Sequence, residues 1–247
     1  TNNGNSFLTN RPARGFFMKN HKVQKIKNQE CKEWFLHKHY AKRIPSTSYA
    51  FGLYQNSSLI GVCSFGRPMS PALTKGAFNG LYQDTFLELN RLVINEGANK
   101  NALSFFVSRS LKLLPKPNVI VSYADTSQHH HGYIYQATNW IYTGLSAKRP
   151  DYHIKGLNLH SASITDSLGR TDKKEGIKQV TLLREKYGDD FYMQDRPRKH
   201  RYFYLLGTKK DKKEMLRNLA YEIEPYPKGD NTRYDSSHLA ATQTLLF

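Results

Sequence analysis

The sequence predicts an α/β fold in which a mixed central sheet is flanked by helices and followed by a basic C-terminal extension. Two observations predict it. Apolar runs typical of strands alternate with amphipathic runs typical of helices, in the order helix, hairpin, strand, helix, strand, helix, strand. The 247 residues are 38% hydrophobic, which is enough to build the core of one large domain.

The first elements are expected to be a basic arm, a helix and a hairpin. Asn28 suits the capping position of a helix, and Ile44-Pro45 ends that helix because a residue before proline avoids the helical region. The turn over residues 55–58 joins two runs of strand type. The expected elements are an arm over 1–27 with room for one short strand, a helix over 29–42, strands over 48–54 and 59–65, and a loop over 66–83.

The following elements continue the alternation, and Pro115 ends the second helix. We expect strands over 85–94, 119–123, 140–145 and 201–206 and helices over 101–114, 132–139, 173–187 and 209–219. The order beyond residue 150 is less regular. The predicted division is a catalytic core over 28–150, a C-terminal part over 151–228 that completes the fold and contacts nucleic acid, and a flexible tail over 229–247.

The charge balance indicates a polyanionic partner. The chain has 37 Lys and Arg against 20 Asp and Glu, a net charge of +17. Each phosphate that Lys or Arg neutralises releases condensed counterions, so nucleic acid is the favoured partner and a merely basic soluble protein is the alternative. No apolar run approaches the roughly 20 residues of a membrane span, so no membrane partner is expected. Cys31 and Cys63 have no disulfide or metal spacing, which favours a reducing cytoplasm.

The strand over 85–94, the turn after it and the helix from Asn101 have the layout of the acyl-CoA N-acyltransferase (GNAT) fold. The first amides of such a helix hold the CoA pyrophosphate, because a helix N-terminus is an anion site. The glycine-rich form of the turn is absent here. Arg91 is expected to contact CoA or DNA, or to pair with Glu88. The expected acetyl-CoA contacts are Arg91, Leu92, Val93, Lys100, Asn101 and Ser104.

Chemistry-bearing residues gather after the strand over 119–123. That strand delivers Ser122, Tyr123 and Asp125 at its C-terminal end, where ligands bind in open α/β sheets. A histidine run and a short helix then present further polar groups, which are costly to bury without partners. The alternative is that Asp125 caps the following helix and that Tyr135 belongs to the core. The polar groups of the short helix are those of Tyr135, Gln136 and Asn139.

This segment resembles the signature of the bacteriophage Mom family. The resemblance rests on Ser122-Tyr123-Ala124-Asp125, His130, Gly132, Ile134-Tyr135-Gln136-Ala137-Thr138-Asn139-Trp140, Tyr142 and Gly144. Further segments similar to the family are residues 34–40 with Arg43, 88–92, 199–202 and 226–228. The resemblance therefore covers roughly residues 30 to 228. His129 and His131 depart from the family pattern, in which small or apolar residues flank His130.

The resemblance implies an acetyltransferase-like enzyme that modifies adenine at N6 in double-stranded DNA. The group implied is carbamoylmethyl (methylcarbamoyl), the donor is acetyl-CoA, and the modification shields phage DNA from restriction in the cytoplasm of the infected bacterium. The functional residues implied are His39, Tyr40 and Asp125, with Tyr135 added as a catalytic candidate. A ferrous iron is associated with the family, and His39 and Asp125 are its candidate ligands. Alternatively, one of the two is a general base and the metal is incidental.

The remaining candidates concern DNA. Tyr135, Gln136 and Asn139 are expected to hold the edge of a flipped adenine, since Asn and Gln make bidentate contacts with adenine. Ser122 and Tyr123 are expected to be further substrate or DNA contacts. Phosphate contacts are expected from Arg198, Lys199 and Arg201 and from the lysines over 209–213. Two rival functions remain open at this stage: an ordinary N-acetyltransferase of a protein or small amine, and a non-enzymatic basic DNA-binding protein. The sequence leaves the oligomeric state open.

Overall fold

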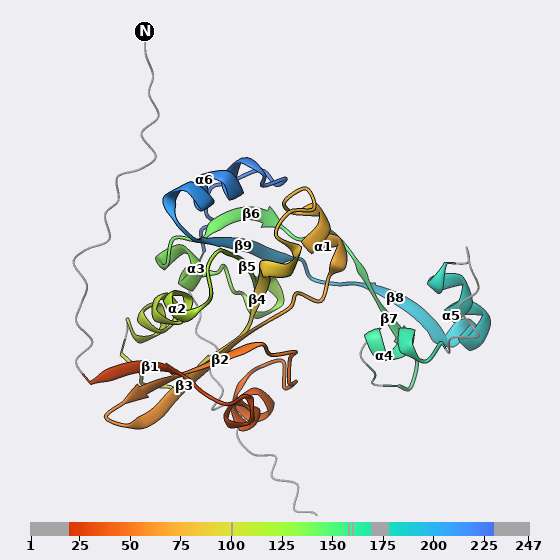
Figure 1. The fold of residues 1–247 in the computed structure, drawn as a ribbon. Coiled ribbons are helices and arrows are strands. Elements are labelled where there is room, and N and C mark those ends of the chain that lie inside the picture. Colours follow the sequence, from red (N-terminus) through yellow and green to blue (C-terminus); the bar gives the residue numbers. More distant parts are fainter. Residues whose placement is uncertain (1–19, 100, 158, 160, 169–177, 230–247) are drawn as a thin grey trace, which may run out of the picture.

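A computed structural model describes residues 20–99, 101–157, 159, 161–168 and 178–229, and Figure 1 shows its fold. Seven strands form one mixed sheet in the order β1-β2-β3-β4-β5-β9-β6, in which β4 and β5 run parallel and the other neighbours antiparallel. The predicted α/β class is therefore confirmed. The strands are β1 His21–Lys25, β2 Tyr49–Gln55, β3 Ser58–Gly66, β4 Phe86–Ile94, β5 Asn118–Asp125, β6 Ile141–Leu145 and β9 Lys199–Leu206.

Helices cover both faces of this sheet, and each face has its own core (Figure 1). On one face, α2 and α3 pack through Phe106 and Tyr135. On the other face, α1 and α6 pack through Leu73 and Met215 in the cluster that contains the buried ring of Phe203. The helices of the main body are α1 Pro71–Gly76, α2 Ala102–Leu113, α3 Tyr133–Ala137 and α6 Lys209–Arg217.

The hairpin of β2 and β3 is confirmed, and its turn explains why the sequence predicts it. Asn56 and Ser57 both have positive φ, as the two central residues of the favoured hairpin turn require. The N-terminal boundary differs from the prediction, because β1 pairs with β2 as the edge of the central sheet. Residues 1–19 of the expected arm lie outside the described part of the chain.

The predicted helix over 29–42 is shorter and irregular, and it ends four residues early. A 3-10 turn, Asn28–Cys31, leads into a wider π-helical turn, Trp34–Lys38. The His39 amide donates to Trp34 O, and His39 itself has an extended backbone. Such π turns are frequent at functional sites because they shift the side chains that follow them.

The segment over 66–83, predicted to be a loop, contains α1. The Ser70 side chain accepts a hydrogen bond from the Leu73 amide, and Pro71 occupies the first turn of the helix. Serine as the cap and proline just after it are a local helix-start signal, so the loop prediction was wrong for a reason visible in the sequence.

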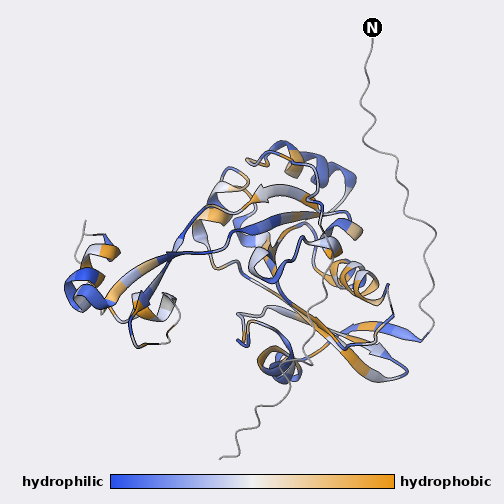
Figure 2. Cartoon of the chain, turned by 180° about the vertical axis from the view of Figure 1, so that it is seen from behind, coloured by the Kyte–Doolittle hydropathy of each residue, from blue (hydrophilic) through white to orange (hydrophobic). Residues whose placement is uncertain are grey.

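Residues 150–195 form an arm that projects from the main body (Figures 1 and 2). Its ribbon consists of β7 Pro150–Ile154 and β8 Phe191–Asp195, and its helices are α4 Ser161–Asp166 and α5 Gln179–Tyr187. The arm has a small core of its own, in which Ile154, Leu183 and Phe191 are buried. Sequence reasoning missed β7, β8 and α4, because two five-residue strands far apart in the chain carry no local pairing signal.

Residues on both sides of the arm build the central sheet. β9 lies between β5 and β6, so the chain after residue 150 contributes a strand to the sheet of the core. Of the helix predicted over 173–187, the described part is α5, which begins at Gln179, and residues 173–177 lie outside the described chain. Among the helices described, none is long and apolar enough to cross a membrane. The tail over 230–247 also lies outside the described residues.

Candidate active site

The central strands β4 and β5 separate in the middle of the sheet. Their parallel ladder has three pairs and ends at Glu88 and Val121. A register shift against β3 leaves Asn90 as an extra residue on β4, and such a bulge bends its strand. Ser122 then bridges the opening, because its hydroxyl donates to the Leu89 carbonyl oxygen at 2.8 Å. The C-terminal half of β4 therefore continues without β5 beside it.

His39 and Tyr40 form a stacked pair beside this opening. Their ring centroids are 4.5 Å apart, and the Tyr40 ring meets His130 edge-on at 6.2 Å. The Ala41 amide donates to His39 Nδ1 at 3.0 Å. A neutral imidazole with Nδ1 as acceptor carries its proton on Nε2, so His39 presents an N–H donor from Nε2.

Asp125 is held as a carboxylate at the end of β5. Its Oδ2 lies 2.8 Å from Lys199 Nζ, and its Oδ1 accepts from the Ser127 amide and hydroxyl at 3.0 and 2.7 Å. Burial alone would raise its pKa, but Lys199 and Ser127 outweigh burial, and the pKa lies below its usual value. The structure thus supports both alternatives for Asp125, since it caps the following turn and also faces the site.

The electrostatics bring the three implied residues into one site. Burial and then the charge of Arg91 lower the pKa of His39 to about 3, and His130 and Lys199 act in the same direction. His39 is therefore neutral at pH 7. Burial and then the Asp125 carboxylate raise the pKa of Tyr40 to about 12, so Tyr40 keeps its proton.

Glu88 is a site residue that sequence reasoning did not select as a candidate. It is the last β4 residue paired with β5, and burial raises its pKa, although Arg91 and Lys199 oppose the shift. Glu88 in turn raises the pKa of the Tyr123 phenol, where burial acts first. A raised carboxylate pKa suits a general base that works near neutral pH. The sequence contains a signal for Glu88, because it is the one carboxylate within an otherwise largely apolar strand.

Tyr135 and Ser122 meet inside the core. The Tyr135 phenol oxygen lies 2.7 Å from Ser122 Oγ, and Tyr135 also packs its ring against Trp140 and Tyr202. Both residues are buried. Both side chains lie in the core next to the opening between β4 and β5, where they hold the surrounding residues in place. This agrees with the alternative that Tyr135 is a core residue.

His39 and Asp125 do not form a metal site in this arrangement. Both Asp125 oxygens are already hydrogen-bonded, and the cations of Lys199 and Arg91 next to these residues oppose a further positive charge. Within the described residues, no group of three or more His, Cys, Asp or Glu side chains is placed to hold a metal ion. The donor set does not fit the expected ferrous iron.

Two of the residues expected to hold adenine are placed elsewhere. Gln136 Nε2 donates to His131 O, to Tyr202 Oη and to Pro227 O, at 3.1 to 3.3 Å. Its amide therefore fastens the histidine loop to the C-terminal segment. Asn139 is exposed and has positive φ just after α3, which is a turn position that asparagine tolerates.

The expected phosphate contacts separate into different environments. Arg201 is buried, donates to Thr143 and lies 3.5 Å from the centroid of the Tyr221 ring, so it is a core cation and no phosphate contact. Arg198 donates to the Ser146 and Leu145 carbonyls. Lys199 belongs to the site through Asp125. The lysines over 209–213 lie on α6, beyond the other end of β9.

The expected acetyl-CoA contacts lie along β4 and at the start of α2. Arg91 lies in the site near Tyr40, while the Leu92 and Val93 side chains face the cores. The Ser104 hydroxyl donates to the Asn101 carbonyl in the first turn of α2. Lys100 lies outside the described residues.

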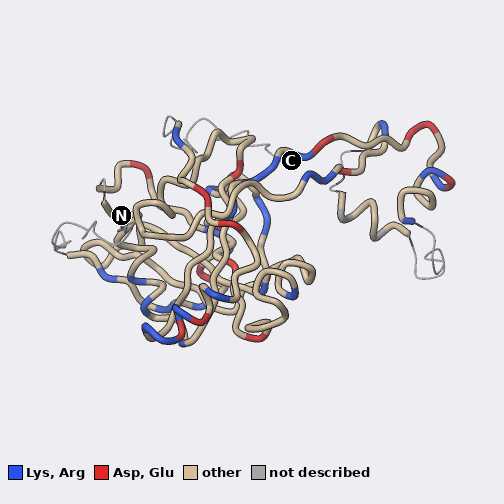
Figure 3. The backbone as a smooth tube through the Cα atoms, turned by 90° about the horizontal axis from the view of Figure 1, so that it is seen from above, with Lys and Arg blue, Asp and Glu red and all other residues tan. Residues whose placement is uncertain are grey.

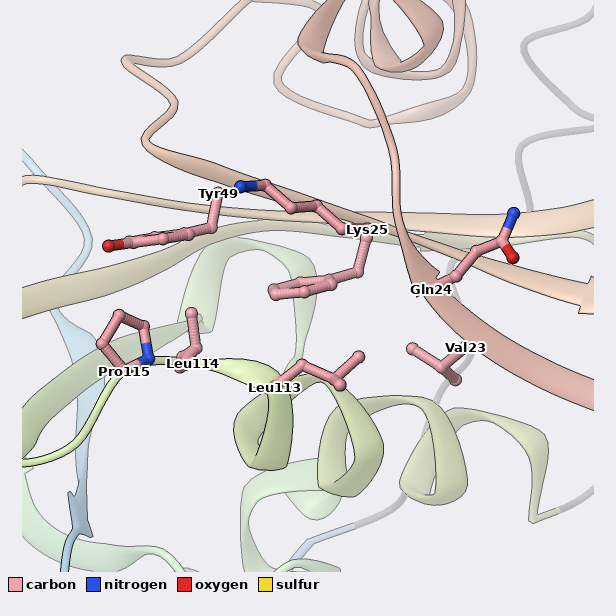
Figure 4. A pocket seen from close by; sticks show the side chains of 8 residues that line it. Val23, Gln24, Lys25, Tyr49, Leu113, Leu114 and Pro115 are labelled. Atoms are coloured by element: carbon pink, nitrogen blue, oxygen red, sulfur yellow. The ribbon is translucent and has the colours of Figure 1, made fainter.

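A separate surface hollow lies away from this site (Figure 4). It has a volume of about 500 Å³ and is formed by β1, β2 and the C-terminal end of α2. Leu113, Leu114 and Pro115 line it beside Lys25 and Tyr49. None of the candidate site residues contributes to it.

Comparisons with known proteins identify the family. A model of the Mom protein family matches residues 20–228. The methylcarbamoylase mom of Escherichia phage Mu is 25% identical over 199 residues, which cover 77% of each chain.

Two similar solved structures are GNAT family acetyltransferases. One, from Bacillus cereus, has a TM-score of 0.38 at 12% identity and covers 75% of this chain and 96% of its own. The other, from Elizabethkingia anophelis with acetyl-CoA bound, has a TM-score of 0.39 at 9% identity and covers 76% and 99%.

Proposed function

The chain belongs to the Mom protein family, and we propose that it modifies adenine at N6 in double-stranded DNA with a methylcarbamoyl group derived from acetyl-CoA. It is a phage modification protein of the Mom type, and its proposed role is to shield phage DNA from restriction in the cytoplasm of the infected host. One observation carries the proposal. His39 and Tyr40 from one end of the chain meet Asp125 and Lys199 at the opening between β4 and β5.

The opening between β4 and β5 suits an extended acyl-CoA donor. Beyond Glu88 no described strand pairs with the β5 side of β4. The Leu89 and Asn90 carbonyls are held by the Ser122 and Arg91 side chains, and the backbone beyond them is available to an amide-containing chain. β4 leads into the turn before α2, and α2 begins with amides that favour a phosphate group. We place the reactive end of acetyl-CoA near His39 and its pyrophosphate near Asn101.

Joining N6 to the methyl carbon of the acetyl group breaks one N–H and one C–H bond with loss of two electrons, and an amine nitrogen displaces CoA-SH. An oxidant and a nitrogen donor supplied to the site therefore complete the reaction, and the part assigned to the residues of this chain is removal of the N6 proton. Glu88 is the proposed base, because its raised pKa brings a carboxylate closer to neutral pH. His39 is a poor base with a pKa of about 3, and its proposed role is to donate from Nε2 to a substrate oxygen. Asp125 holds Lys199 in place, and Lys199 in turn offers its charge to an anionic group.

The target adenine is proposed to leave the helix stack. Adenine N6 inside a duplex is out of reach of a site lined by half-buried groups. The stacked rings of His39 and Tyr40 are a platform for a planar base, and base–aromatic stacking contributes about 1–3 kcal/mol. A duplex with 2-aminopurine beside the target adenine should gain fluorescence on binding, and an unchanged signal would exclude flipping.

Mass spectrometry of digested nucleosides tests the proposed function. Plasmid DNA from cells expressing the protein is expected to contain deoxyadenosine that is heavier by one methylcarbamoyl group, and Asp125→Asn cells are expected to lack it. An acetyl adduct would retain the DNA target and discard the proposed group. Unmodified DNA from cells with confirmed expression would overturn the proposal in favour of another acceptor.

The donor is tested separately by thermal unfolding. A ligand that binds the native state, present at 100 times its dissociation constant, stabilises that state by about 2.7 kcal/mol. Acetyl-CoA is therefore expected to raise the melting temperature of the purified protein, while equal concentrations of AMP should not. A non-enzymatic DNA-binding protein would show no such rise.

A further inference from the structure

The projecting arm has a two-stranded ribbon with one side toward the arm's own core and one side away from it. Strands alternate their side chains, and residues paired across β7 and β8 point to the same side. Ile154 and Phe191 point to the arm's own core beneath α4 and α5. The opposite side, here called the outer face, carries His153 and Tyr192, whose rings stack 5.2 Å apart, and the paired residues Gln194 and Asp151. Tyr192 is 44% exposed.

Positive charge gathers where the arm leaves the main body (Figure 3). This neck consists of residues 146–151 and 194–199. Its carboxylates are Asp151 and Asp195, and Asp151 is paired with Arg196 across the ribbon. Lys148 and Arg149 are exposed. The cations of the neck are Lys148, Arg149, Arg196, Arg198 and Lys199.

The neck is continuous with the active site. Lys199 ends the neck and begins β9, and its ammonium holds Asp125. Two backbone hydrogen bonds join the strands of the neck, from Ser146 N to Lys199 O at 2.7 Å and from Arg196 N to Arg149 O at 3.0 Å. The arm therefore starts at the edge of the site and extends away from it.

We infer that the arm binds double-stranded DNA, with the outer face of its ribbon in the major groove and the exposed neck cations Lys148 and Arg149 on the flanking phosphates. This inference rests on the proposed function, because it names the surface that holds the DNA beside the site. A ribbon whose strands lie about 4.8 Å apart fits a major groove about 12 Å wide. Imidazole, phenol and amide groups of the outer face are of the kind that contact base edges, and the neck complements the phosphate charge.

Two variants test the two parts of this surface. Lys148→Glu/Arg149→Glu is expected to weaken binding of a fluorescein-labelled duplex at least tenfold. It should also flatten the dependence of log affinity on log salt, by about 0.9 for each phosphate that the variant no longer neutralises. Tyr192→Ala/Gln194→Ala removes no charge and should weaken binding severalfold with an unchanged salt slope. Fluorescence anisotropy across a salt series measures both.

A matched control separates the surface from total charge. Lys112→Glu/Lys116→Glu makes the same charge change at exposed positions before β5, whereas Asp125 is at the other end of that strand. This control should bind DNA within about twofold of the wild type at equal salt. An equal reduction in affinity in the control and in Lys148→Glu/Arg149→Glu would overturn the inference. Circular dichroism and acetyl-CoA binding of each variant exclude misfolding as the cause.

The outcomes also distinguish the inference from the proposed function. If the wild type modifies plasmid adenine and both arm variants bind and modify DNA as well as it does, the inference is wrong and the proposed function stands. If the wild type binds duplex DNA through the arm and no modified adenine forms, the inference stands and the proposed chemistry is wrong. A wild type without affinity for duplex DNA overturns both.

Discussion

The Lys199 ammonium lies 2.8 Å from the Asp125 carboxylate, and this pair joins the first residue of β9 to the last residue of β5. The two residues are also cross-strand partners in the sheet register, so the pair aligns the strand that returns from the arm. Its position means that the base of the arm and the candidate active site share one ion pair. Substitutions at this pair and at the residues around it are therefore expected to change stability, modification or both.

Lys199→Met is expected to lower the free energy of unfolding by about 1–2 kcal/mol at pH 7, because it leaves a half-buried carboxylate without its cation. The figure is discounted because the Lys199 side chain is 35% exposed. The pKa of Asp125 is lowered in the native state, so this stability is present above the unfolded pKa of about 3.9 and is lost as the pH falls through the folded pKa. Urea unfolding should show a smaller destabilisation at pH 3 than at pH 7, and equal destabilisation at both would contradict the ion pair.

His39 should make stability depend on pH in a different window. Its pKa falls from about 6.5 in the unfolded chain to about 3 in the native protein, so the unfolded chain binds the extra proton. Stability is complete above pH 6.5 and declines as the pH falls toward 3. His39→Gln is expected to reduce the slope between pH 6 and 4.5 by up to about 1.4 kcal/mol per pH unit. Urea titrations at a series of pH values measure this slope. His37→Gln, at an exposed histidine, is the control and should leave the slope unchanged.

Glu88→Gln is expected to slow DNA modification by about 100- to 1,000-fold, because it removes the proposed base. In the wild type the rate should rise with pH through the raised pKa of Glu88, and the variant should lack this rise. The measurement is the rate of formation of modified deoxyadenosine by mass spectrometry between pH 5 and 8. A slower variant with an unchanged pH profile would show that Glu88 only supports the fold.

Tyr135→Phe is expected to destabilise the protein by about 1 kcal/mol, since it removes one buried hydrogen bond to Ser122 and leaves the ring in place. Ser122→Ala should cost more, because it also frees the Leu89 carbonyl. The double variant should cost less than the sum of the two single changes, as expected for residues in contact. Additive effects in urea unfolding would show that the two hydroxyl groups act independently.

Residue patterns within single segments predict the parts of the fold that depend on neighbouring residues. The turn at Asn56 and Ser57 predicts its hairpin because both are common turn residues and asparagine tolerates positive φ. The apolar run of β5 predicts a buried strand. Short sequence motifs also indicated His39, Tyr40 and Asp125 as candidate site residues through the family resemblance. The missed helix α1 belongs here too, since Ser70 and Pro71 are a local signal for its start.

Tertiary structure alone decided which distant segments meet. The arm separates β6 from β9 in the sequence, yet β9 lies between β5 and β6 in the sheet. No residue pattern within β9 specifies these two neighbours. Arg198, Lys199 and Arg201 form one basic run in the sequence, yet each has different partners in the packed chain. Arg198 donates to the Ser146 carbonyl, Lys199 pairs with Asp125, and Arg201 donates to the Thr143 carbonyl in the core. Glu88 has a raised pKa only because β4 is buried. Burial and long-range pairing depend on the packed chain as a whole, which is why local residue patterns predict the elements better than the site.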